Sequence, residues 1–175
     1  MKTRQRIAKP PLALESDEPG KAGDVATETV FLAVTGMSSA ILTETVWALA
    51  HPPNAGSPVV PDRIVAITTL PGKGRIEDEL FKACPHYAGQ SVWQALRQEI
   101  LGPGFERDPR LNLDTVQVIS QRDPTLGRSF PLEDIRTPAD NDVAADFILE
   151  EVRKLTENAD IRVVASLAGG RKTMG

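Results

Sequence analysis

Residues 161–175 read IRVVASLAGGRKTMG, and this stretch decides how the rest of the chain is interpreted. The apolar run 161–167 is typical of a buried strand, because strands covered on both faces of a sheet are almost continuously apolar. The run is followed by two glycines, two cations and a hydroxyl: Gly169, Gly170, Arg171, Lys172 and Thr173. Glycine lets the main chain turn tightly and approach a ligand, and cations beside exposed N–H groups suit a phosphate. The stretch predicts an anion site at a strand end; the plainer interpretation is a surface turn carrying two solvated cations.

Upstream of this stretch, apolar runs alternate with helical patterns. Strands are expected at 29–34, 63–68, 116–119 and 161–167, and helices at 41–50, 76–84, 92–101 and 138–158. A turn is expected at 71–74, where a proline and two glycines lie close together. Ser91 with Gln94, and Thr137 with Asp140, have the spacing of helix caps. The alternation predicts an α/β fold with a mostly parallel sheet and helices on both faces.

In such a sheet, ligands bind beyond the carboxyl ends of the strands. This rule gathers the polar strand ends into one region: 35–39, 68–69, 120–122 and 166–173. A serine between a strand and a helix is most often a helix cap, so Ser38 or Ser39 is expected to have that role.

Composition limits the classes of function. The chain has 175 residues, with 24 acidic and 20 basic residues and a net charge of −4. This charge disfavours binding of long nucleic acid but not of a small anion held by local cations. A single cysteine, Cys84, and two separated histidines, His51 and His86, argue against a disulfide and a metal site.

Residues 1–27 are polar and without periodicity, which predicts a flexible tail before one domain at 28–175. No apolar run is long enough for a membrane helix and no secretory signal is present, so a cytoplasmic protein is expected. A helix would be expected after the glycine turn. We therefore expect the domain to be truncated at its C-terminus and the chain to be a fragment of a longer protein.

The chain lacks the residue spacing of three common nucleotide-binding and hydrolase motifs. A P-loop needs glycine directly before Lys172-Thr173, and Arg171 occupies that place. The loop at 35–40 gives no G-x-G-x-x-G, and Ala40 excludes the G-x-S-x-G turn of serine hydrolases. The common nucleotide fingerprints and this type of hydrolase are therefore disfavoured.

Five motifs in matching order resemble the CRISPR-associated ring nuclease family, whose members are CARF-domain proteins of type III CRISPR systems. The motifs are Val34-Thr35-Gly36-Met37-Ser38, Thr43-Glu44-Thr45, Ile67-Thr68-Thr69, Asp134-Ile135-Arg136-Thr137 with Asp140-Asn141, and Ser166-Leu167-Ala168-Gly169-Gly170-Arg171-Lys172-Thr173-Met174. The resemblance covers residues 29–175, and the last motif is the most specific.

The resemblance implies a Rossmann-like CARF domain that forms a homodimer and binds cyclic tetra-adenylate, an antiviral second messenger, across the two-fold axis. It implies cleavage without a metal or other cofactor, in which a ribose 2′-OH attacks the adjacent phosphorus and leaves a 2′,3′-cyclic phosphate. Positioning and electrostatic stabilisation would supply the catalysis.

By motif, the resemblance makes Ser38 and Lys172 the catalytic residues. The ligand-binding positions it implies are Gly36, Met37, Ser39, Thr68, Thr69, Gln121, Arg136, Asn141, Ser166, Gly169, Gly170, Arg171 and Thr173. Relatives often carry proline after the first serine, where this chain has Ser39, so either hydroxyl could face the ligand.

Two other functions remain open. A non-catalytic sensor would bind the ring and regulate an effector; the R-x4-6-H motif of HEPN ribonucleases precedes neither histidine of this chain. A generic Rossmann-like domain would bind another nucleotide.

Overall fold

The computed structural model describes residues 28–53 and 56–169. Strands and helices follow in the order β1 (Glu28–Thr35), α1 (Ala40–Ala50), β2 (Arg63–Thr68), α2 (Leu70–Ile76), η1 (Glu77–Phe81), η2 (Pro85–Tyr87), α3 (Val92–Leu101), η3 (Phe105–Arg107), β3 (Asn112–Val118), β4 (Ser120–Asp123), β5 (Arg128–Pro131), α4 (Pro138–Thr156) and β6 (Ile161–Gly169). The predicted tail lies outside the described residues, and so do Gly170, Arg171, Lys172 and Thr173.

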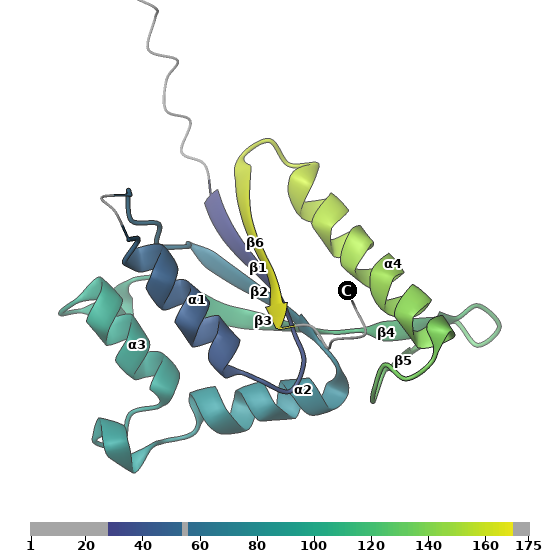
Figure 1. Ribbon diagram of the computed structural model, residues 1–175, viewed down its shortest axis with the longest axis horizontal. Coiled ribbons are helices and arrows are strands. Elements are labelled where there is room, and N and C mark those ends of the chain that lie inside the picture. The colour runs from purple at the N-terminus through teal and green to yellow at the C-terminus, as the bar shows by residue number, and fades with distance from the viewer. Residues whose placement is uncertain (1–27, 54–55, 170–175) are drawn as a thin grey trace, which may run out of the picture.

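A four-stranded parallel sheet forms the centre of the molecule (Figure 1). Its strand order is β3-β2-β1-β6, and all three pairings are parallel. The chain adds β2 and β3 on one side of β1 and then returns through α4 to place β6 on the other side. This arrangement confirms the predicted α/β class and is compatible with a Rossmann-like fold.

Helices cover both faces of the sheet, as predicted. The side chains of β1 alternate between two apolar cores, because successive residues of a strand point to opposite faces. Phe31 and Ala33 join the core under α1 and α3, whereas Val30, Leu32 and Val34 join the core under α4. Figure 1 shows α1 and α3 on one side of the sheet and α4 on the other. All five of these side chains are buried, so β1 is an inner strand in packing as well as in order.

The turn predicted at 71–74 is wrong. These residues lie within α2, which begins at Leu70 with Pro71 in its first turn, where the missing N–H of proline is not needed. The helix continues as the π-helical turn η1, and Cys84 lies beyond its end, so the predicted boundary at 84 is also wrong.

An antiparallel hairpin, β4–β5, was not expected. Residues 120–122, predicted to be an irregular strand end, form β4 and pair with β5, so that Gln121 lies opposite Phe130. The hairpin extends from the end of β3 beneath α4 (Figure 1). Its return brings residues 132–136 back to the main sheet.

Both predicted helix caps are confirmed, and each is a reciprocal capping box. Ser91 accepts a hydrogen bond from the Gln94 N–H and donates its own N–H to the Gln94 side chain. Thr137 and Asp140 make the same reciprocal pair at the start of α4. These bonds satisfy N–H groups that have no partner within the helix, so the helix starts are defined by sequence.

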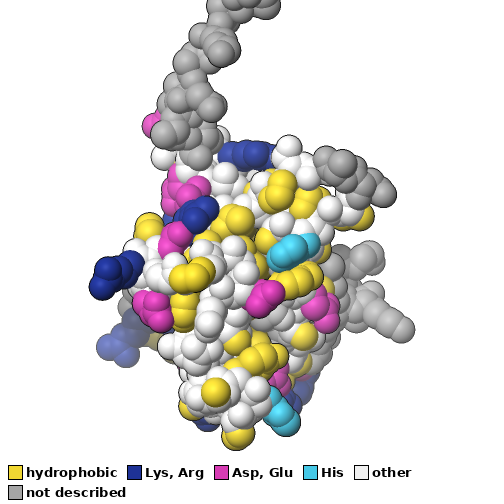
Figure 2. All heavy atoms as spheres, turned by 90° about the vertical axis from the view of Figure 1, so that its left-hand side faces the viewer, with side chains coloured by type: hydrophobic (Ala, Val, Ile, Leu, Met, Phe, Trp, Pro, Cys, Tyr) yellow, Lys and Arg dark blue, Asp and Glu magenta, His cyan; other side chains and the backbone are white. Residues whose placement is uncertain are grey.

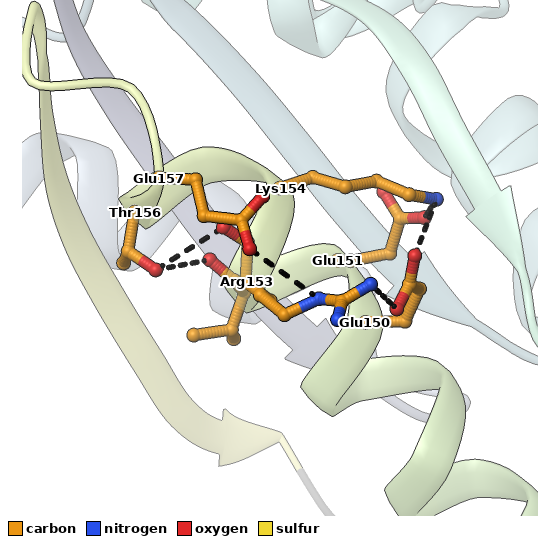
Figure 3. Close-up of polar contacts among 7 residues, drawn as sticks. Glu150, Glu151, Arg153, Lys154, Thr156 and Glu157 are labelled. Atoms are coloured by element: carbon orange, nitrogen blue, oxygen red, sulfur yellow. Dashed lines mark hydrogen bonds and ion pairs between the residues drawn. The ribbon is translucent and has the colours of Figure 1, made fainter.

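The cations near the end of α4 are paired with carboxylates on the same helix (Figure 3). Arg153 Nη2 lies 2.8 Å from Glu150 Oε2, and Lys154 Nζ lies 2.8 Å from Glu151 Oε1. Lys154 Nζ also lies 3.9 Å from Glu150 Oε1. This surface therefore has no excess of positive charge and does not compete as an anion site. Among the described residues, no helix is both long and apolar enough to cross a bilayer.

Candidate functional site at the carboxyl ends of the strands

The strand order changes direction at β1, because β2 and β6 lie on its two sides although they are far apart in sequence. In open α/β sheets, a crevice forms at such a point beyond the carboxyl ends of the strands. A pocket of about 300 Å³ lies there. Its lining comes from the ends of β1, β2 and β3 and from the segment after the hairpin: Val34, Thr35, Gly36, Met37, Thr69, Pro71, Ile119, Glu133, Asp134, Ile135 and Arg136.

The hairpin explains why residues 133–136 reach this pocket. Ile119 donates its N–H to the Thr68 carbonyl at 2.8 Å, and Leu132 donates to the Ile119 carbonyl at 2.8 Å. The Leu132 carbonyl in turn accepts the Leu70 N–H at 2.9 Å. These bonds tie both ends of the hairpin to the end of β2. The segment that carries Asp134 and Arg136 is thus fixed beside the β1 loop.

The loop after β1, residues 35–39, is held by short polar contacts. The Thr35 hydroxyl donates to the Ser38 carbonyl at 2.8 Å. Thr68, which is 0% exposed, has its hydroxyl 3.4 Å from the Gly36 carbonyl. Thr68 therefore lies beneath the loop, where its hydroxyl supports the main chain, whereas the neighbouring Thr69 lines the pocket.

Ser38 and Ser39 occupy different environments. Ser39 is 3% exposed, and its hydroxyl donates to the Glu79 carboxylate on η1. It stands at the N-cap position of α1 but makes no side-chain cap, so the expected capping role of either serine is wrong. Ser38 is exposed, and it is the serine whose side chain is open to a ligand.

Arg136 is the cation among the described residues of the pocket lining, and its side chain is 80% exposed. Its Nε donates to Asp134 Oδ2 at 2.8 Å, which raises the pKa of the Arg136 guanidinium above its ordinary value. Its backbone N–H donates to Asp140, and this bond, with a second from the Thr137 N–H, lowers the pKa of the Asp140 carboxyl. The first turn of α4 therefore fixes the main chain of Arg136.

The end of β6 meets the pocket at Thr35. Ser166 pairs with Ala33, but Gly169 pairs with Thr35, so three steps along β6 face two steps along β1. Such bulges redirect a strand and are common next to active sites. Because Thr35 lines the pocket, Gly169, the last described residue of β6, lies beside its edge.

Three predicted residues on β4, α4 and β6 are not brought to this pocket. Gln121 is exposed on β4 and lines a separate hollow with Arg122, Asp123, Pro124 and Phe130. Asn141 is half-buried in the first turns of α4 and is not part of the lining. Ser166 lies on β6 and is half-buried, also outside the lining.

Sequence reasoning missed the pocket contribution of Pro71, Ile119 and Glu133. The missed signal was the hairpin: an apolar residue at 119 and a polar segment at 133–136 flank it. Once the hairpin is recognised, the residues on both sides of it are expected to meet at the carboxyl end of the sheet. No group of three or more His, Cys, Asp and Glu side chains suited to a metal ion occurs in the described part of the chain.

A second hollow, of about 780 Å³, lies between α1 and α3 and contains Trp47, His86 and Tyr87. Figure 2 shows this face of the molecule, where hydrophobic side chains are mixed with polar ones. Neither Lys nor Arg is among the described residues that line it, and none of the predicted site residues is present. It is therefore a poor candidate for an anion site.

A family model described as CRISPR-associated protein NE0113 matches residues 38–175, which is more than half of the chain. Comparison with curated proteins and with solved structures gave no match. The chain belongs to the CRISPR-associated protein NE0113 family.

Proposed function

We propose that this protein is a ring nuclease that binds and cleaves cyclic tetra-adenylate and so ends type III CRISPR signalling in the cytoplasm. The observation that carries the proposal is the convergence, in a CRISPR-associated chain, of Gly36, Met37, Thr69 and Arg136 on one pocket. These residues come from three separate motifs of the resemblance, and the strand order unites them at the point where α/β sheets bind ligands.

Charge and position support the terminal motif as the phosphate-binding part of the site. In the described lining, Arg136 is already paired with Asp134. Arg171 and Lys172 come two and three residues after Gly169, which pairs with Thr35 at the pocket edge. They supply the positive charge that the pocket itself lacks, and the amides of Gly169 and Gly170 and the Thr173 hydroxyl add donors to the phosphates.

The size of the pocket supports a homodimer. A volume of about 300 Å³ is at the lower end of ligand pockets, which span roughly 300–1,000 Å³. It accommodates one part of a ring of four nucleotides, so a second copy, related by a two-fold axis, contacts the other part. A ring with even symmetry matches such an axis.

In the reaction, the oxygen of a ribose 2′-OH forms a bond to the adjacent phosphorus, and the bond from phosphorus to the 5′ oxygen breaks. The 2′-OH proton is lost and the departing 5′ oxygen gains a proton, which leaves a 2′,3′-cyclic phosphate and a 5′-OH. Lys172 stabilises the charge on phosphorus or on the departing oxygen, and Ser38 orients the 2′-OH or the phosphate. Preorganised donors of this kind are worth about 10²–10³ in rate each.

The test is cleavage of labelled cyclic tetra-adenylate by the full chain in EDTA, measured with enzyme in excess. Lys172→Ala is expected to slow cleavage by more than about tenfold, because one charged contact to the transition state is lost. Lys154→Ala is the matched control, since Lys154 is paired with Glu150 and Glu151 on the exposed side of α4. Equal rates for Lys172→Ala and the control would remove Lys172 from the mechanism.

One observation favours a second candidate, a sensor that binds the ring without cleaving it. Ser38 is not part of the pocket lining, whereas four predicted ligand-binding residues are: Gly36, Met37, Thr69 and Arg136. Binding of the ring could therefore occur without Ser38, whereas the proposed cleavage requires it. Tight binding with no product in the same assay would select the sensor over the nuclease.

A further inference from the structure

The net negative charge of the described pocket lining disfavours binding of a phosphate inside the pocket. Two carboxylates, Glu133 and Asp134, stand against one guanidinium, Arg136, and the remaining described lining residues are uncharged. A phosphate placed among them would face two like charges, which disfavours its ionised form. The part of the ligand that occupies this pocket should therefore be neutral.

The walls of the pocket are suited to a flat apolar surface. Val34, Ile119 and Ile135 are buried residues whose side chains belong to the core under α4. Met37, 45% exposed, lines the pocket from the β1 loop, and Pro71 lines it from the first turn of α2. Methionine adapts its shape and makes favourable contacts with aromatic rings.

The two carboxylates differ in what they already bind. Asp134 Oδ1 accepts the Ile135 N–H at 2.9 Å, and its Oδ2 accepts Arg136 Nε at 2.8 Å. Glu133 makes no hydrogen bond or ion pair with any residue that the structure describes. It is thus an acceptor at the pocket that a ligand can use.

We propose that this pocket receives one adenine base, and that the Glu133 carboxylate accepts a hydrogen bond from its 6-amino group. The inference rests on the proposed function and adds the origin of base specificity. Adenine presents an N–H donor at position 6, whereas hypoxanthine and guanine present a carbonyl oxygen there. A carboxylate attracts the first and repels the second, and the apolar walls contact the faces of the ring.

This assignment separates the two halves of a nucleotide within the site. The base lies in the pocket between the β1 loop and residues 133–136, and the phosphates lie at its mouth, beside Thr35, which pairs with Gly169. The negative lining then selects the base and also keeps phosphates out of the pocket.

The experiment compares two rings that have the same phosphates and size, cyclic tetra-adenylate and cyclic tetra-inosinate. Their equilibrium affinities are measured with the full chain at one salt concentration. The wild type is expected to prefer the adenine ring by about 10- to 100-fold, the range of one hydrogen bond to a charged group. Glu133→Gln is expected to reduce this preference to about threefold or less, because an amide can both accept and donate.

Glu99→Gln serves as the control, because Glu99 is an exposed carboxylate of α3 that lines the second hollow. It should keep the wild-type preference. If Glu133→Gln also keeps the full preference while cyclic tetra-adenylate still binds, the assignment of Glu133 is wrong and the proposed function stands. If the wild type binds neither ring, the assignment and the proposed function fail together.

Discussion

Gly72 supports the loop that carries Met37 and Ser38, and its replacement by alanine tests that support. A Cβ at position 72 would lie 2.0 Å from Thr68 Oγ1 and 2.8 Å from the Gly36 carbonyl oxygen. Thr68 is fully buried and its side chain is short, so it has no room to move away. Relief therefore requires the Gly36 main chain to shift, which displaces the loop.

The magnitude follows from comparison with Gly74, which lies in the same helix. A Cβ at Gly74 meets no atom within 4 Å. Both substitutions gain helix propensity, worth about 1 kcal/mol, so that term cancels in their difference. The remaining steric term is at the upper end of overpacking, about 3 kcal/mol. We expect Gly72→Ala to be destabilised by about 2 kcal/mol and Gly74→Ala to be stabilised by up to about 1 kcal/mol.

Thermal unfolding measures this difference. For a chain of this size, 1 kcal/mol corresponds to about 2–4 °C, so the two alanine variants should differ in Tm by about 6–12 °C. Adding Thr68→Ala to Gly72→Ala removes the closest contact and should recover part of the loss. Affinity for cyclic tetra-adenylate should fall in Gly72→Ala and stay at the wild-type level in Gly74→Ala. Equal Tm values for the two variants would refute the close packing of α2 on the loop.

Three further predictions concern the surroundings of the site. Glu79→Ala leaves the buried Ser39 hydroxyl without its partner, so it should lower the free energy of unfolding by about 1 kcal/mol and weaken binding of the ring. Glu79→Gln keeps an acceptor and should change stability and affinity little. Equal effects of the two substitutions would count against this contact. Thr137→Ala removes one half of the cap of α4 and should lower stability by about 1 kcal/mol, measured by urea unfolding, while Thr137→Ser should be neutral. Hydrogen bonds from Arg110 lower the pKa of Asp108 from 3.8 to about 2, so the ionised carboxylate stabilises the fold above about pH 4 and this contribution is lost as the pH falls to about 2. The Tm of Asp108→Asn should therefore decrease less than that of the wild type between pH 4 and pH 2, and parallel decreases would contradict the assignment.

The sheet and its coverage were predictable because burial leaves a direct pattern in sequence. The run 29–34 is apolar on both faces, and the structure places it between two cores. The start of α2 was not predictable in this way. Pro71, Gly72 and Gly74 favour a turn by local propensity, and tertiary packing overrides it, since Gly72 is required where the helix contacts Thr68 and Gly36.

The candidate site was predictable only in part. The rule about strand ends correctly brought Gly36, Met37 and Thr69 to one pocket, and Arg136 joined them. It misplaced Gln121, because β3 is followed by a hairpin whose strands are short, polar and exposed and therefore have no hydrophobic alternation to reveal them. The different environments of Ser38 and Ser39 depend on Glu79, forty residues away, and no local pattern encodes that contact.

The most direct test of the central claim is the mass and chromatographic behaviour of the first product formed from cyclic tetra-adenylate by the wild-type full chain in EDTA. Attack by a 2′-OH rearranges bonds and adds no water. We therefore expect a first product with the mass of the substrate but a different retention time, which acid treatment converts to a species heavier by one water. A first product that is already heavier by one water would contradict the mechanism, and an unchanged ring would contradict cleavage itself.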